Sequence, residues 1–294
     1  MTKNPYKNLK LWNGIMAGLH AIQGIAMVSL TKSDSLKQIF ISLPKPNPEQ
    51  RSFGNVVENW YQVNLGYVIA SFLFLSALAH LITILPKVYE WYINNLKNQL
   101  NLIRWFEYAL SSSVMVYVIA YLCGISDGLM LFVLVSINAC MNLFGASMEL
   151  HNSNLKKQAK PQKIIQTVTQ GDEIFSSFKI DTTSYKTEWS NFVYGCFAGI
   201  VPWVVMGTYF FVSLDRLGNI DTLPDNVKNA LKTVKFIFPA LFIFFNCFAI
   251  NMVLQYKKLG PWKNYLTGEK VYIILSLTAK SFLAWFIWGG TLRP

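Results

Sequence analysis

Seven long apolar stretches constrain the fold of this chain more than any other feature of its sequence. They cover about residues 11–30, 62–86, 104–125, 127–150, 191–214, 233–256 and 270–292. Each stretch is long enough to cross the hydrocarbon core of a bilayer as a helix, which takes about 20 residues. We therefore expect residues 1–294 to form one all-α membrane domain, a bundle of seven transmembrane helices.

The composition excludes two common classes of protein. Only 14% of the residues are charged and 53% are hydrophobic, whereas a soluble domain has about 25% charged residues. This argues against an ordinary soluble enzyme. The net charge of +11 is also found in nucleic-acid-binding proteins, but such proteins place their basic residues on a hydrated surface. We expect a lipid bilayer and no nucleic acid as partner. No Cys/His spacing typical of a metal site occurs.

The distribution of Lys and Arg among the loops predicts the orientation of the chain. The amino terminus and the even-numbered loops contain fifteen of these cations, and the other side contains at most nine. Because basic loops stay in the cytoplasm, we expect a cytoplasmic amino terminus and an extracellular carboxyl terminus. The long loop 31–61 is then extracellular and the long loop 151–189 cytoplasmic. The Lys-rich start of loop 151–189 could bind anionic lipid or a protein partner, although a solvated loop is the simpler interpretation.

Lys280 is the most informative polar residue, because it lies in the middle of the last apolar stretch, VYIILSLTAKSFLAWFIWGG. Either end of that helix is roughly 15 Å away, too far for a lysine side chain to reach water. One interpretation is a structural ion pair. The other is a desolvated, reactive amine that forms a Schiff base with an aldehyde.

Glu107, in RWFEYALSSSVM, is the natural partner of such a cation. Arg104 and Ser111 lie on the same helical face as Glu107, so an interfacial Arg104–Glu107 salt bridge is the alternative. Ser276 lies one turn before Lys280 and faces the same way.

Two histidines lie in the middle of the first two stretches. His20 and His80, with Ser76 one turn from His80 and Gln23 one turn from His20, indicate a polar cluster. Its members either accept protons or satisfy one another by hydrogen bonds between helices.

Together, the two motifs RWFEYALSSSVM and KVYIILSLTAKSFLAW and the two histidines resemble the heliorhodopsins, microbial-type retinal-binding rhodopsins with inverted topology. The resemblance extends over all seven stretches and implies a rhodopsin-like bundle.

The resemblance implies all-trans retinal, bound covalently to Lys280 as a protonated Schiff base, with Glu107 as counterion and Ser276 beside the linkage. Further pocket residues implied by it are Tyr108, Ser112, Asn138, Met141, Gly145, Trp203, Phe245 and Trp285. His20, Ser76 and His80 would line a polar cavity on the cytoplasmic side. A homodimer and an extracellular strand pair in the first loop are also implied.

The sequence differs from proton-pumping rhodopsins at two positions where a pump has carboxylates, which here are Val118 and Ser276. Because pumping needs an ordered donor and acceptor, the leading hypothesis is a non-enzymatic light sensor. It would have a slow photocycle and an unidentified cytoplasmic signalling partner. The alternative is light-gated or light-driven proton transport, with Glu107 central and Glu149 and Glu188 as relays. A third possibility is a bundle without a chromophore, acting as a transporter or as a regulator of a membrane enzyme.

Overall fold

The computed structural model describes residues 6, 8–47, 52–159, 162–170, 173–181, 186–216 and 223–292. Among these residues, seven helices are long and apolar enough to cross a membrane, which confirms the predicted seven-helix bundle. They are α1 (Leu9–Leu30), α2 (Leu65–Thr83), α4 (Leu102–Leu122), α5 (Gly128–Gln158), α6 (Ser190–Arg216), α7 (Asp225–Tyr256) and α8 (Tyr265–Ile287). The short helices η2 (Gly260–Lys263) and η3 (Trp288–Leu292) flank α8.

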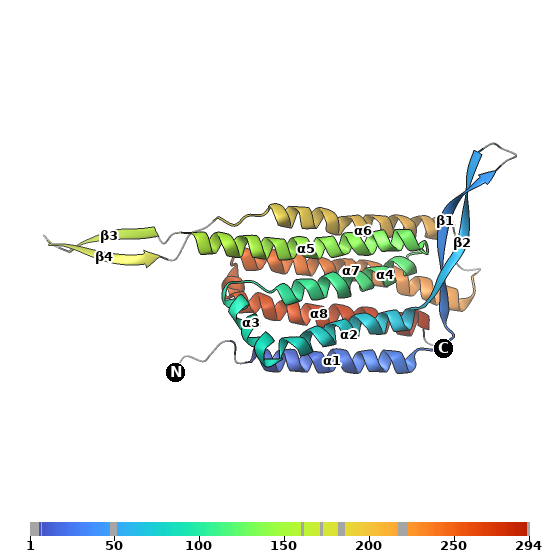
Figure 1. The fold of residues 1–294 in the computed structure, drawn as a ribbon, viewed down its shortest axis with the longest axis horizontal. Helices are drawn as coiled ribbons and strands as arrows, with labels where there is room; N and C mark the ends of the chain where they lie inside the picture. Colours follow the sequence, from blue (N-terminus) through green and yellow to red (C-terminus); the bar gives the residue numbers. More distant parts are fainter. Residues whose placement is uncertain are drawn as a thin grey trace.

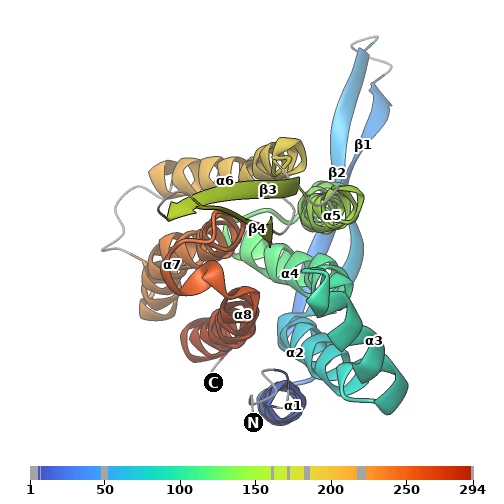
Figure 2. The same ribbon diagram turned by 90° about the vertical axis from the view of Figure 1, so that its left-hand side faces the viewer.

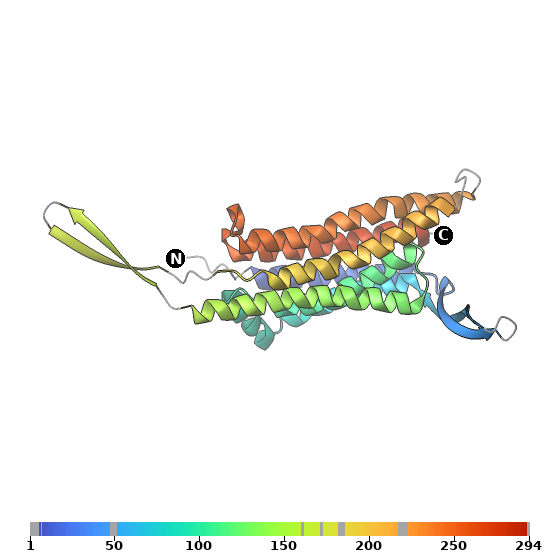
Figure 3. The same cartoon turned by 90° about the horizontal axis from the view of Figure 1, so that it is seen from above.

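The helices run along one elongated bundle (Figure 1). α1 begins at one end of the bundle, called here the amino-terminal end, and α8 stops at the opposite, carboxyl-terminal end, as an odd number of crossings requires (Figures 1 and 3). Seen along the bundle, the helices follow one another in chain order, and α8 returns to lie beside α1 (Figure 2). α6 and α7 meet through aromatic rings, since Trp203 of α6 contacts Phe238, Phe242 and Phe245 of α7 at centroid distances of 5.3–5.5 Å.

The second predicted stretch, 62–86, is divided among three elements. A strand ends at Asn64, whose side chain accepts a hydrogen bond from the backbone N–H of Gly66 and so caps α2. After Thr83 the chain turns, and Pro86 begins a separate short helix, α3 (Pro86–Lys97). Proline suits this first position because its missing N–H would have no partner there. α3 lies at the amino-terminal end of the bundle (Figure 1).

The loop at 151–189 contains more regular structure than its sequence indicates. α5 continues to Gln158, and two antiparallel strands follow, β3 (Gln162–Gln170) and β4 (Glu173–Asp181). The pair projects away from the amino-terminal end of the bundle (Figure 1). α7 likewise begins earlier than predicted, at Asp225 rather than near residue 233.

The strand pair expected in the first loop is present. β1 (Leu36–Asn47) and β2 (Ser52–Asn64) are antiparallel and extend from the carboxyl-terminal end (Figure 1). The base of this hairpin is attached to the turn between α4 and α5: the backbone N–H of Phe40 donates to the carbonyl of Ser126 at 2.9 Å, and Ile39 is fully buried. Gly124, with φ of +100°, allows that turn to be short.

Polar caps explain where three of the bundle helices begin. The side chain of Asn101 accepts from the backbone N–H of Arg104, that of Asp127 from Met130, and that of Asn264 from Leu266. These bonds satisfy backbone groups that have no partner in the first turn of a helix. The Asn101 cap fixes the start of α4, which contains Glu107.

Candidate functional site

Lys280 and Glu107 form a buried ion pair across the bundle. The Nζ of Lys280, on α8, lies 2.7 Å from Oε1 of Glu107, on α4. It also donates to Oγ of Ser276 at 2.8 Å, and the hydroxyl of Ser76 on α2 donates to the same Glu107 oxygen at 2.6 Å. Lys280 is 2% exposed. Three helices therefore hold one cation and one anion in contact inside an apolar bundle, where the paired charges stabilise each other strongly.

A cavity of about 340 Å³ lies between α4, α5, α6, α7 and α8, and Lys280 is among the residues that line it. Its lining is mainly aromatic and aliphatic, and its volume falls in the range of small-molecule sites. Most of the predicted pocket residues line it: Tyr108, Ser112, Met141, Gly145, Trp203, Phe245, Ser276 and Lys280. The cavity is thus a mainly apolar space with the amine of Lys280 in its lining.

Two predicted pocket residues are not part of this lining. Asn138 lies behind it and donates to the hydroxyls of Ser112 and Ser113 at 2.8 and 3.0 Å. Trp285 instead donates from Nε1 to the side chain of Gln23 on α1 at 3.0 Å, so Gln23 contacts α8 rather than the histidines.

Several lining residues were not predicted from the sequence. Trp105, Phe248 and Tyr272 form an aromatic group with Tyr108, and Asn142 donates to Ser112 at 3.1 Å. Apolar residues of this kind occur throughout the spans, so the sequence alone does not distinguish a pocket residue from a core residue. The spacing of Asn138 and Asn142, one helical turn apart, was the available signal for the amide pair.

The histidines of α1 and α2 lie against each other. The rings of His20 and His80 are stacked, with centroids 5.8 Å apart and planes inclined by 11°. Nδ1 of His80 lies 2.7 Å from the side-chain oxygen of Asn13. A small cavity of about 40 Å³ touches His80, Asn13 and Glu107. Of the three residues expected to line a polar cavity, His80 alone is in this lining; His20 stacks on His80, and Ser76 contacts Glu107 directly.

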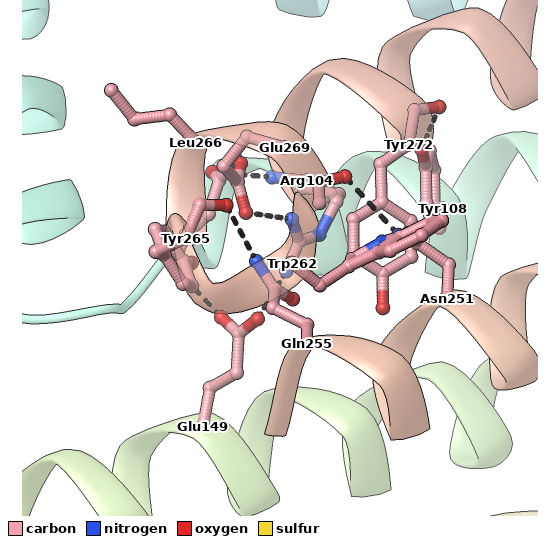
Figure 4. Close-up of polar contacts among 12 residues, drawn as sticks. Arg104, Tyr108, Glu149, Asn251, Gln255, Trp262, Tyr265, Leu266, Glu269 and Tyr272 are labelled. Carbon is pink, nitrogen blue, oxygen red and sulfur yellow. Dashed lines mark hydrogen bonds and ion pairs between the residues drawn. The ribbon is translucent and has the colours of Figure 1, made fainter. Parts of the chain in front are cut away.

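Arg104 does not pair with Glu107 as the alternative interpretation required. Its guanidinium forms ion pairs with Glu149 on α5 and Glu269 on α8 (Figure 4). Glu269 was not singled out from the sequence, because a carboxylate in the first turns of a span resembles an ordinary interfacial residue. Its spacing was a usable signal: eleven residues, about three helical turns, separate it from Lys280 and place both on one face.

Glu188, a predicted relay, lies outside the bundle core, just before α6. Its backbone N–H donates to Asn152, and its carboxylate accepts from the backbone N–H and the hydroxyl of Ser190. These hydrogen bonds lower the pKa of the Glu188 carboxyl below its ordinary value. Its described partners tie it to the start of α6 and the end of α5.

Comparison with known protein families identifies the fold. A sequence model of the heliorhodopsin family matches residues 9–171 and 174–292, nearly the whole chain. The chain belongs to the heliorhodopsin family. The comparison with curated proteins gives no match. Heliorhodopsins are non-enzymatic membrane proteins that bind retinal and absorb light, so the hypothesis of a bundle without a chromophore is wrong.

The residues of this heliorhodopsin fit a retinal molecule. The cavity is mainly apolar, has a volume of about 340 Å³, and has the amine of Lys280 in its lining, in contact with the carboxylate of Glu107. A polyene aldehyde needs these features: apolar walls along its length, an amine at its carbonyl carbon and an anion close to the resulting positive charge.

Proposed function

We propose that Lys280 binds all-trans retinal covalently, as a Schiff base whose positive charge is balanced by Glu107. The contact of 2.7 Å between Nζ of Lys280, which lines the apolar cavity, and Glu107 carries this proposal. When bound, retinal supplies absorption of visible light and a light-driven isomerisation. Ser276 holds the Lys280 nitrogen by a hydrogen bond, and Ser76 holds the Glu107 carboxylate.

We further propose that this protein is a light sensor with a slow photocycle that does not pump ions. The buried carboxylates support this, because Glu107, Glu149 and Glu269 all lie nearer than Lys280 to the helix ends at the amino-terminal end of the bundle, where α4 and α8 begin and α5 ends. Further along α4, Val118 is fully buried at the position where a pump has a second carboxylate, and the buried polar residues Ser113 and Asn138 are uncharged. Pumping needs donors and acceptors arranged on both sides of the site.

Light-gated or light-driven proton transport is the second candidate. The small cavity of about 40 Å³ favours it, because that cavity is lined by Glu107, Ser276, Arg104 and Glu269 and so provides polar space toward the amino-terminal end. Photocurrent recording under illumination separates the two candidates. A sensor gives no photocurrent, whereas a transporter gives one that changes in Glu107→Gln.

The retinal site is tested by substituting Lys280. Lys280→Ala and Lys280→Arg are expected to lose the visible absorption band after reconstitution with retinal, because neither side chain can form the link. Lys270→Ala is the matched control: this partly exposed lysine lies on the same helix and should keep the band. A coloured, retinal-loaded Lys280→Ala protein would contradict the proposal.

We also propose that the amino-terminal end of the bundle faces the cytoplasm and the carboxyl terminus lies outside. Basic residues at that end support this orientation, among them Lys10, Lys87, Lys97, Lys257 and Lys258. Labelling of single cysteines with a membrane-impermeant reagent in intact cells tests it. We further propose a homodimer, testable by cross-linking in the membrane, and a cytoplasmic signalling partner.

A further inference from the structure

The charges buried around Arg104 do not balance. Arg104 is 6% exposed, and Glu149 and Glu269 are 1% exposed each. Both carboxylates form ion pairs with the one guanidinium (Figure 4). If both were ionised, a group with one positive and two negative charges would be buried in an apolar bundle, and a buried charge without a partner is strongly destabilising.

The two carboxylates share two hydrogen-bonding partners, Arg104 and Asn101. Arg104 donates one guanidinium N–H to each. Asn101 donates its backbone N–H to Oε2 of Glu149 and its side-chain amide to Oε2 of Glu269, both at 2.8 Å. The side chain of Trp105 also interacts with Glu149. Each carboxylate therefore has one charged and at least one neutral donor, and both form an ion pair with Arg104.

No further cation compensates for the second carboxylate within the described part of the chain. The ion pairs of Glu149 and Glu269 there are both with Arg104, and Lys280 is paired with Glu107. The amino termini of α4 and α8 add at most about half a positive charge each, and that contribution weakens beyond the first turn.

His80 and Glu107 line the small cavity beside this cluster, and the remaining titratable groups that face it are tyrosines. Tyr272 packs its ring against the guanidinium, with Cζ of Arg104 3.9 Å from the ring centroid. Tyr108 on α4, Tyr265 on α8 and Tyr92 on α3 also act on the cluster electrostatically. Neutral phenols can donate hydrogen bonds but cannot supply a positive charge.

We propose that Glu149 and Glu269 hold one proton between them, which makes the Arg104 cluster electrically neutral. Two interacting carboxyl groups titrate as a pair, so the proton belongs to the site rather than to one residue. This proton-binding site is distinct from the Lys280–Glu107 ion pair. The small cavity lined by Arg104, Glu269 and Glu107 places it beside the counterion region, and the inference does not depend on how retinal is bound.

Infrared spectroscopy tests the proposal, because a protonated carboxylic acid and a carboxylate absorb at different frequencies. Wild type minus Glu149→Gln, and wild type minus Glu269→Gln, should each show the loss of one protonated carboxyl at neutral pH. Either substitution leaves a single carboxylate, which ionises beside Arg104. Glu58→Gln, an exposed position in β2, is the matched control and should lose no such band.

The proposal would be overturned if the same protonated-carboxyl band persisted in either Glu149→Gln or Glu269→Gln. The band would then come from a group other than this pair, or the remaining carboxyl group would stay protonated beside Arg104. Arg104→Gln gives the opposite expectation, a gain of a second protonated carboxyl. If these variants fail to fold, the wild type alone decides: without a band from a buried protonated carboxyl at neutral pH, the proposal is wrong.

Discussion

Gly145 of α5 lies against the ring of Trp105 of α4, and its replacement by alanine should damage the cavity. An added Cβ would lie 2.3 Å from Cζ3 and 2.4 Å from Cη2 of Trp105. To restore even a tight contact of 3.4 Å, the ring must move by about 1 Å. That ring has little freedom, since it packs edge-on against Tyr108 and Tyr272. Trp105 also lines the cavity, so its displacement changes the space for retinal.

The expected magnitude follows from two opposing effects. Overpacking of this kind costs about 1–3 kcal/mol, while replacing a helical glycine by alanine gains about 0.5–1 kcal/mol. Together these ranges allow a net loss of about 0–2.5 kcal/mol, and we expect Gly145→Ala to lower the free energy of unfolding by about 1 kcal/mol. Gly195→Ala is the matched control on α6, beside the same cavity, because its new Cβ would meet Phe144 and Met141 at ordinary distances of 3.4 and 3.5 Å.

The assay is the midpoint of thermal bleaching, with the yield of retinal-bound protein as a second readout. Gly145→Ala should lower both the midpoint and the yield. At about 2–4 °C per kcal/mol, the midpoint should fall by a few degrees. Gly195→Ala should match or slightly exceed the wild type. If Gly145→Ala behaves like Gly195→Ala, the close packing of Gly145 on Trp105 does not limit the pocket and the reasoning is refuted.

Two further predictions concern the remaining carboxylates. Glu149→Gln and Glu269→Gln should each lower the free energy of unfolding by only about 1 kcal/mol. The double variant leaves Arg104 buried without an anion and should lower it by about 3–5 kcal/mol. If the thermal shift of the double variant equals the sum of the two single shifts, this prediction is wrong. Ser190→Ala should raise the pKa of Glu188 toward its ordinary value by removing a hydrogen bond to the carboxylate. Because the wild-type pKa is lowered, the stabilisation from this carboxylate is present above its unfolded pKa and is lost as pH falls through the lowered pKa. Infrared titration of the carboxylate band in both proteins measures the change.

The seven spans and the Lys280–Glu107 pair could be predicted from sequence for one physical reason. A bilayer demands long apolar helices, and it makes any charge inside one costly enough to need a partner. Lys280 and Glu107 were therefore conspicuous against their apolar neighbours, and Ser276 followed from the helical repeat. Arg104 was equally visible, but its partners were not, because the sequence does not say which helix faces it.

The parts that could not be predicted depend on helix rotation and on local chain turns. Phe248 and Tyr272 line the cavity, whereas Trp285 contacts Gln23, yet all three are aromatic residues within apolar spans. The separate helix α3 starts at a proline in a stretch that is continuous in hydropathy. Hydropathy averages over a window and misses such a break, although Pro86 itself was a signal for a helix start.

The hydrogen bond from Phe40 to Ser126 links the movement of α4 to the position of the β1–β2 hairpin outside the bundle. α4 contains Glu107, and its last turn leads directly into the short segment that includes Ser126. Any axial slide or tilt of α4 must then either drag the base of β1–β2 or break that bond. A small tilt of α4 would move the far end of the hairpin by a larger distance, which a fluorescent probe attached there would report. Movement of α4 near Glu107 would then be measurable at the carboxyl-terminal end of the bundle.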